Sequence, residues 1–90
     1  MRHLALECAP YNISVNAIAP GWFVTELTDN YFCDEKNKDI AHSIISRVPL
    51  KRVGQVKELL GATLLLISNA GKYITGEVLR VDGGLAINDV

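Results

Sequence analysis

The stretch that decides the fold is Ile13-Ser14-Val15-Asn16-Ala17-Ile18-Ala19-Pro20-Gly21. From residue 13 to residue 19, apolar residues alternate with small or polar ones, which is the period of a β-strand, and the β-branched residues favour the same structure. Pro20 and Gly21 then end the strand. The sequence therefore predicts a strand that runs directly into a turn.

Predicted helical and loop segments flank this strand. Upstream, Met1 to Ala9 is rich in good helix formers and stops at Pro10. No capping residue precedes this helix, and about two turns are too few to be stable alone, so we expect it to be the end of a longer helix. Downstream, Trp22 to Cys33 is predicted to be a loop that could include a short helical turn.

Two further helices are predicted in the second half. Apolar positions four, five and eight residues apart predict a helix between Asp34 and Val48, which Pro49 closes. A second helix, from Gln55 to about Asn69, is apolar most of the way round, which predicts burial on more than one side. Gly71 is expected to be the glycine that ends this helix.

A second strand is predicted from Glu77 to Val81, after a turn at Gly76 and before the turn Asp82-Gly83-Gly84. Two strands separated by helices favour parallel pairing with helical crossovers, which is the α/β class. Two parallel strands leave two open edges and two faces to cover. We therefore expect about three helices and two strands that are incomplete by themselves.

Composition limits the function classes. The chain has 90 residues, of which 49% are hydrophobic and 21% charged, with a net charge of −1, so neither disorder nor binding to nucleic acid or to a membrane surface is expected. Its longest apolar stretch, Leu59 to Ile67, is about half of the roughly 20 residues that span a bilayer. With no secretory signal and with Cys8 and Cys33 expected as free thiols rather than metal ligands, the expected location is cytoplasmic.

The turn after the first strand is the candidate ligand site. Loops at the carboxyl ends of strands are where ligands bind in open α/β sheets. Gly21 permits close approach to the main chain, Phe23 offers backbone groups and Thr25 places a hydroxyl nearby, a set that suits a planar amide or a phosphate. The alternative is that Pro20-Gly21 only ends the strand.

Four segments in the right order resemble the short-chain dehydrogenases/reductases, and the resemblance covers essentially the whole chain. These segments are Leu4 to Glu7, Ile13 to Gly21 with Thr25, Pro49 to Gly54, and Ile74 to Gly84. The sugar-acid and sugar-alcohol dehydrogenases, such as gluconate 5-dehydrogenases, and the 3-oxoacyl reductases are the most similar branches.

The resemblance implies that residues 1–90 are the C-terminal portion of one NAD(P)-binding domain with a Rossmann-type doubly wound parallel sheet. The cofactor would be NAD or NADP. The loop 20–25 would lie at the nicotinamide, with Pro20 and Gly21 forming its floor and with the backbone of Phe23 and the hydroxyl of Thr25 holding the carboxamide or a phosphate. Relatives more often have an aliphatic residue in place of Phe23, a change that a backbone contact tolerates.

The remaining segments would serve the substrate and the assembly. Residues 26–48 would form a substrate lid, with Trp22 and Leu27 facing a small-molecule alcohol or ketone, although Trp22 could equally be a core anchor. The helix and strand of residues 55–84 resemble the elements that pair between subunits of family tetramers. A homo-oligomer through this segment is therefore expected.

The catalytic residues of the family are not among these 90. Its Tyr-x-x-x-Lys pattern would lie upstream of Met1, and Tyr11, Tyr31 and Tyr73 are followed four residues later by Val, Glu and Glu. No glycine-rich phosphate loop is found either. The chain alone is thus expected to be inactive. Three hypotheses remain open: part of an oxidoreductase, a non-enzymatic truncated product that docks onto full-length relatives, and a decayed product without a stable fold.

Overall fold

The computed structural model describes residues 1–88. Its helices and strands are mixed along the chain, in the order α1, β1, β2, α2, α3, β3, α4, β4. The α-helices are Arg2–Cys8 (α1), Glu26–Cys33 (α2), Lys38–Arg47 (α3) and Val56–Ile67 (α4), and the strands are Ala17–Pro20 (β1), Phe23–Val24 (β2), Gly54–Gln55 (β3) and Val78–Val81 (β4). Short 3₁₀ helices cover Ala9–Tyr11, Glu35–Asn37, Asn69–Gly71 and Leu85–Ile87.

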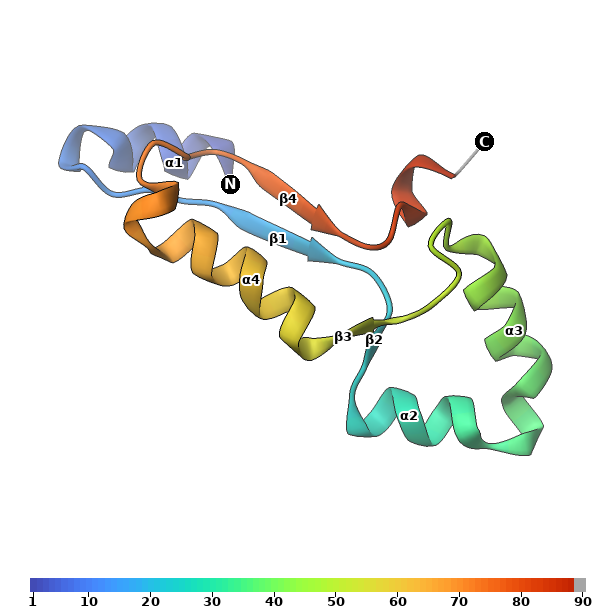
Figure 1. Ribbon diagram of the computed structural model, residues 1–90. Helices are drawn as coiled ribbons and strands as arrows, with labels where there is room; N and C mark the ends of the chain where they lie inside the picture. Colours follow the sequence, from blue (N-terminus) through green and yellow to red (C-terminus); the bar gives the residue numbers. More distant parts are fainter. Residues whose placement is uncertain (89–90) are drawn as a thin grey trace.

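The two longer strands, β1 and β4, form a parallel pair in which Ala17 lies opposite Val78 and Pro20 opposite Val81. Helix α1 lies behind this pair and α4 in front of it (Figure 1). The connection from β1 to β4 thus includes a helical crossover through α4, and helices α1 and α4 flank the pair on opposite sides. The predicted α/β class with parallel strands is confirmed.

Strand β1 is shorter than the sequence predicted, because residues 13–16 face a turn instead of a partner strand. Val15 donates its amide hydrogen to the Thr75 hydroxyl (3.1 Å) and accepts one from Gly76 (2.8 Å). Gly76 adopts a φ of +76°, as the predicted turn requires. The expected strand over residues 13–16 is therefore wrong, since the chain opposite it turns before β4 begins.

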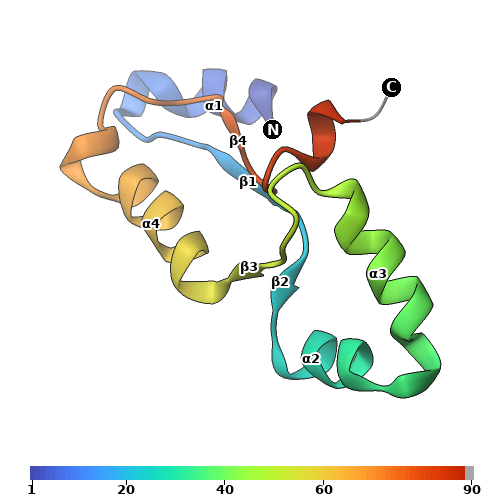
Figure 2. The same ribbon diagram turned by 45° about the vertical axis from the view of Figure 1, so that its right-hand side comes forward.

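The expected loop over Trp22 to Cys33 is also wrong, because most of this segment is ordered as β2 and α2. Strand β2 pairs in parallel with β3, with Phe23 opposite Gly54. Helix α2 begins at Glu26 because Thr25 caps its first turn through its side chain. Figure 2 shows α2 and α3 as an arm that joins the rest of the chain through β2 and β3.

Helices α3 and α4 confirm the two predicted from apolar spacing, but Gly71 does not have the expected role. Helix α4 ends at Ile67, and Ser68 is its C-terminal cap. Gly71 is buried in the next 3₁₀ helix, where the carbonyl oxygen of Leu65 leaves no room for a Cβ. A glycine is needed at this position for space and not for a left-handed backbone.

The fold is open and poorly covered. Within residues 1–88 the buried hydrophobic residues are Ala5, Ala41 and Val48. The radius of gyration is 16.3 Å, against about 12 Å for a compact domain of this length. The accessible surface is 6975 Å², against about 5,200 Å² for a compact monomer of this size.

Helix α4 carries much of the exposed apolar surface. Its exposed apolar residues are Val56, Leu60, Leu64, Leu65 and Ile67. Exposed apolar residues that gather on one element in this way mark a surface that another element or another chain can cover. Within residues 1–88, no helix is both long enough and apolar enough to cross a bilayer.

Candidate nicotinamide-side site

Gly21 fixes the place where the candidate loop leaves the strand pair. Its amide donates to the carbonyl oxygen of Val81 (3.0 Å), which extends the ladder by one residue. A Cβ on Gly21 would lie 2.8 Å from the Cα of Asp82, so the two main chains touch. The first residue of the predicted loop is therefore held against the end of β4, while the neighbouring Pro20 is exposed.

The Asp82 turn opposite is built for this close contact. The Asp82 carboxylate accepts hydrogen bonds from the amides of Gly84 (3.0 Å) and Ala86 (3.1 Å). Gly83 and Gly84 have φ angles of +64° and +91°, in the region that favours glycine. The expected turn at Asp82-Gly83-Gly84 is confirmed, and it forms one wall beside Gly21.

The pairing of β2 with β3 sets the direction of the Phe23 backbone. Gly54 donates its amide hydrogen to the Trp22 carbonyl oxygen (2.8 Å), so this carbonyl faces β3. Because backbone groups of successive strand residues point to opposite edges, the N–H and C=O of Phe23 point away from β3. The Phe23 ring lies over Gly54, where a Cβ would come within 2.6 Å of the ring.

Thr25 and Thr28 form a reciprocal cap at the start of α2. The Thr28 amide donates to the Thr25 hydroxyl oxygen (3.2 Å), and the Thr25 amide donates to the Thr28 hydroxyl oxygen (2.7 Å). The Thr28 hydroxyl in turn donates to the Phe23 carbonyl oxygen (2.6 Å). Thr28 thus connects Phe23 and Thr25. The sequence identified Phe23 and Thr25 as candidate site residues but did not identify Thr28.

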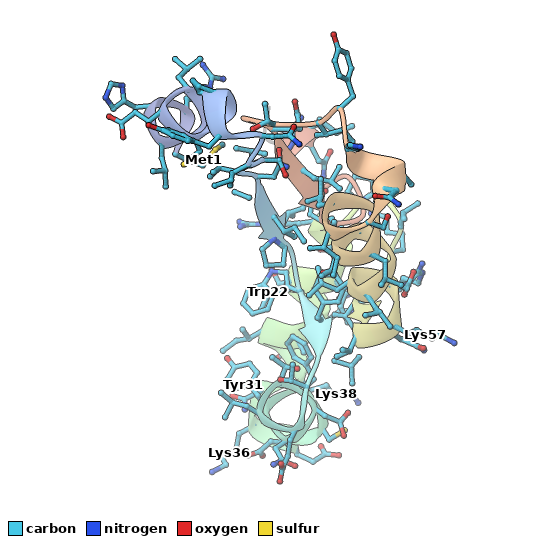
Figure 3. All side chains as sticks on the ribbon, turned by 90° about the vertical axis from the view of Figure 1, so that its left-hand side faces the viewer. Met1, Trp22, Tyr31, Lys36, Lys38 and Lys57 are labelled. Carbon is cyan, nitrogen blue, oxygen red and sulfur yellow. The ribbon has the colours of Figure 1, made fainter. Side chains whose placement is uncertain are left out.

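Trp22 lies in an aromatic cluster with α2. Its ring is 6.1 Å from that of Phe32, which is 5.7 Å from that of Tyr31, both in edge-to-face geometry. Figure 3 shows Trp22 and Tyr31 on the same side of the molecule. Trp22 is 42% exposed, so it is not buried as a core anchor within residues 1–88. Leu27, in the first turn of α2, is 78% exposed.

A groove of about 490 Å³ connects the loop with the end of β4. Trp22 and Phe23 form one side of it, and the Asp82 turn forms another. The segment before α4 completes the wall, with Pro49, Leu50, Arg52 and Gly54. The groove is therefore built from three segments that are distant in the sequence.

An ion pair between Arg52 and Glu58 fixes the segment beside the loop. The guanidinium makes two hydrogen bonds to the carboxylate, of 2.7 and 2.8 Å, and the Gln55 amide donates to the same carboxylate (3.0 Å). These bonds favour the charged form of the carboxylate, so the pKa of Glu58 is lowered to about 2. The hydrogen bond from Arg52 is the larger cause, and the one from the Gln55 amide is the next. The same pair raises the pKa of Arg52.

Four residues have contacts in this arrangement that the sequence-based predictions did not give them. Thr28 stands three positions after Thr25, which is the spacing of a capping box, but the second residue of that motif is usually Glu or Gln. Gln55 and Glu58 have that spacing too and also form a capping box. Nothing in the sequence predicts that Gly54 lies under the Phe23 ring, since the contact depends on a pairing of two-residue strands.

The donor and acceptor groups of the loop fit a nicotinamide carboxamide. A carboxamide needs a donor for its oxygen and an acceptor for its NH₂ group. The Phe23 N–H and the second lone pair of the Phe23 carbonyl oxygen point to the same edge of β2, and the Thr25 hydroxyl adds a further donor beside them. The three groups therefore supply the donors and the acceptor that a planar amide requires, and the binding of a carboxamide or a phosphate by this loop stays a prediction.

The chain is similar to solved dehydrogenases along almost its whole length. A 4-hydroxyisoleucine dehydrogenase complexed with NADH superposes with a TM-score of 0.83 at 33% identity, over 96% of this chain and 34% of that one. YwfH, an NADPH-dependent reductase involved in bacilysin biosynthesis, gives a TM-score of 0.82 at 32% identity, over 93% and 34%. The fold is thus that of part of a Rossmann-type α/β dehydrogenase domain.

The sequence gives the family as well. Residues 1–86 match the family model described as enoyl-(acyl carrier protein) reductase. The chain belongs to this family of short-chain dehydrogenases/reductases, and the resemblance inferred from its motifs is confirmed.

Curated relatives extend well beyond the matched segment. The 3-oxoacyl-[acyl-carrier-protein] reductase FabG of Buchnera aphidicola is 45% identical over 84 residues, which are 93% of this chain and 32% of that protein. The gluconate 5-dehydrogenase of Gluconobacter oxydans is 38% identical over 85 residues, 94% of this chain and 32% of that protein. The chain spans about a third of the length of these relatives.

Proposed function

We propose that this chain is the part of an NAD(P)-dependent oxidoreductase that closes the nicotinamide end of the active site. The observation that carries the proposal is the outward-facing N–H and C=O pair of Phe23 next to the Thr25 hydroxyl. Both lie at the carboxyl end of β1, which is the edge where ligands bind in this fold class. The bound dinucleotide, NAD or NADP, would supply or accept the hydride exchanged with an alcohol or ketone.

The residues of this chain would bind and orient rather than react. Phe23 would hold the carboxamide through its backbone, and Thr25 would donate its hydroxyl hydrogen to the same group or to a phosphate. Gly21 would keep the loop flat against the Asp82 turn, and the exposed Pro20 would border the ring. No residue of the chain is assigned an acid or base role, so the proposal requires a Tyr-x-x-x-Lys pattern from outside these 90 residues.

The direction of α1 is compatible with that requirement. Helix α1 runs opposite to β1, so its N-terminal end points toward the edge at which β1 ends (Figure 1). A helix prolonged in that direction would approach the Pro20 to Thr25 loop.

The lid proposal covers residues 26–48, which form the arm of α2 and α3. Trp22 and Leu27 expose apolar surface next to the loop, and this surface would contact the substrate. A sugar acid and a 3-oxoacyl compound are the two candidate substrates, because the curated relatives above include enzymes named for each. A cytoplasmic location is part of the proposal, since Cys8 and Cys33 are free thiols, as is usual in a reducing compartment.

An assembly role for residues 55–84 is proposed from the bare apolar side of α4. A homotetramer would cover Leu60 and Leu64, which are 55% and 51% exposed. The same surface supports the second candidate function, a non-enzymatic module that docks onto full-length relatives. The two candidate functions differ in whether the loop at Phe23 binds a cofactor.

The proposal is tested by exchanging the matching segment of the Buchnera aphidicola FabG for residues 1–90. This hybrid, called here the exchange protein, supplies the missing part of the domain. We expect saturable NAD(P)H binding, followed by the fluorescence of the dihydronicotinamide, and reduction of a 3-oxoacyl or keto-sugar-acid substrate. The isolated chain, measured in parallel, is expected to show no saturable binding.

A folded exchange protein that binds neither NADH nor NADPH would overturn the proposal. A smaller exchange of residues 20–33 alone gives the same readout where the larger one does not fold. Size-exclusion chromatography of the isolated chain with the unaltered FabG tests the docking alternative. Co-elution that survives salt, together with no cofactor binding by either hybrid, would favour that alternative.

A further inference from the structure

The Thr28 side chain is the point at which the two candidate cofactor-binding residues are connected. Its hydroxyl oxygen lies 2.6 Å from the Phe23 carbonyl oxygen, 2.7 Å from the Thr25 amide nitrogen and 3.1 Å from the Thr25 hydroxyl oxygen. Its own amide donates to the Thr25 hydroxyl oxygen (3.2 Å). Both groups offered to a ligand are therefore fixed by one residue in the first turn of α2.

The hydrogen-bond capacity of a hydroxyl determines how these contacts are shared. A threonine hydroxyl has one proton and two lone pairs. The Thr28 proton goes to the Phe23 carbonyl oxygen, the shortest acceptor contact, while one lone pair accepts the Thr25 amide hydrogen. The second lone pair can accept the Thr25 hydroxyl hydrogen, which holds that proton until a ligand offers a better acceptor.

The contact at Phe23 sets the plane of its peptide group. The carbonyl keeps one lone pair for a ligand while the other is bonded to Thr28, so it cannot rotate away without losing a 2.6 Å hydrogen bond. Because β2 is only two residues long, its pairing with β3 alone holds this peptide weakly. Thr28 thus supplies, from α2, the restraint that a longer strand would give.

We propose that Thr28 is a positioning residue for cofactor binding, which orients the Phe23 carbonyl and the Thr25 hydroxyl toward the nicotinamide carboxamide. This inference rests on the proposed function. Thr28 touches the two binding groups and not the reacting atoms, so it acts through them. Its role differs from helix capping alone, which would require only the contact with the Thr25 amide.

Three substitutions in the exchange protein separate positioning from capping. Thr28→Val keeps the shape and removes the hydroxyl, whereas Thr28→Ser keeps the hydroxyl. Thr28→Glu keeps an acceptor for the Thr25 amide, as in an ordinary capping box, but has no proton for the Phe23 carbonyl. Thr63→Val is the matched control, because the Thr63 hydroxyl donates to the Leu59 carbonyl oxygen (3.1 Å) inside α4, away from the loop.

The measurements are the dissociation constant of NADPH, KM and kcat, the stereospecificity of hydride transfer with 4-deuterated NADPH, and Tm. For Thr28→Val and Thr28→Glu we expect weaker NADPH binding, on the order of tenfold, as for loss of one well-made hydrogen bond. Both variants should also lose stereospecificity, because the carboxamide is no longer held. Thr28→Ser should stay within about twofold of the parent, and Thr63→Val should change Tm alone.

Two results would overturn the inference. One is NADPH binding by Thr28→Val that equals that of the parent, and the other is full recovery by Thr28→Glu, which would reduce the role to capping. If the Thr28→Val protein does not fold, the comparison of NADPH binding by Thr28→Ser and Thr28→Glu decides between positioning and capping. A folded parent that binds neither NADH nor NADPH counts against the proposed function instead, so the two failures are distinguishable. A parent that binds only NADH is compared with its variants in the same way, with NADH in place of NADPH.

Discussion

Arg52 holds Glu58 through two parallel hydrogen bonds, of 2.7 and 2.8 Å, between side chains six residues apart. The pair closes the segment that contains Gly54, the residue that pairs with Phe23. A bidentate guanidinium–carboxylate contact is directional as well as charged. The ion pair thus fixes the start of α4 and, through Gly54, the loop at the candidate site.

The first prediction concerns pH. The pKa of Glu58 is lowered from 4.5 to about 2 in the folded chain, so its contribution to stability is present above pH 4.5 and is lost as the pH falls toward 2. The Tm of the exchange protein should therefore drop over this window, and Glu58→Gln should make this part of the drop disappear. Asp34→Asn, which alters an exposed pair with Lys36 at 3.9 Å, is the control. Parallel acid profiles for the parent and Glu58→Gln would contradict the prediction.

The second prediction compares two glycines. Gly54→Ala would place a Cβ 2.6 Å from the Phe23 ring, which should destabilise the protein by about 1–3 kcal/mol through overpacking and weaken NADPH binding. Gly61→Ala in α4 meets nothing within 4 Å and should stabilise the helix by about 1 kcal/mol. Urea unfolding of the exchange protein measures both. Equal effects of the two substitutions would show that the Phe23 contact is unimportant.

The third prediction concerns Asn16, whose side chain replaces ladder bonds where β1 has not yet begun. It donates to the Ile74 carbonyl oxygen (3.1 Å) and accepts from the Glu77 amide (3.0 Å). Asn16→Ala should destabilise the exchange protein by about 1–3 kcal/mol, because two backbone groups, of which the Ile74 carbonyl is part-buried, lose their partner. Asn16→Asp keeps only the acceptor for the Glu77 amide, so its free energy of unfolding should lie between those of the parent and Asn16→Ala. If Asn16→Ala changes the free energy of unfolding by less than about 0.5 kcal/mol, the size of an ordinary surface substitution, the proposed structural role of the Asn16 side chain is contradicted.

The fourth prediction tests the assembly surface. Leu64→Lys places a charge in the apolar face of α4 and should reduce the oligomeric state of the exchange protein, measured by light scattering. Leu6→Lys on α1 is the matched control, since Leu6 is 73% exposed and lies outside residues 55–84. Dissociation by Leu6→Lys with no effect of Leu64→Lys would place the interface elsewhere.

The main elements could be predicted from sequence because each carries a local pattern. Alternation found β1, apolar spacing found α3 and α4, and glycines with positive φ marked the turns at Gly76 and Gly83. The order of these elements then indicated parallel pairing. Local patterns of this kind need no knowledge of which segments meet.

The errors arose where non-local contacts decide the structure. Helix α2 was missed because it is only eight residues long and Leu27, Tyr31 and Phe32 continue the helical spacing for little more than one turn. In addition, the Thr25–Thr28 cap is an uncommon form of its motif. The strand pair β2–β3 was missed because each strand has only two residues, too few to show the alternation of apolar and polar residues that predicts a strand. At the candidate site, Phe23 and Thr25 could be identified from the family motif, whereas Thr28 and Gly54 required the folded backbone.

The contact between Gly21 and Asp82 limits which sequences this protein can adopt. Any side chain at position 21 adds at least a Cβ, and that atom would lie 2.8 Å from both the Cα and the Cβ of Asp82, neither of which can move without the main chain. Pro20, one position earlier, is exposed and meets no such restriction. In a library that randomises both positions, position 20 should accept many residues, while selection for folding should return glycine alone at position 21.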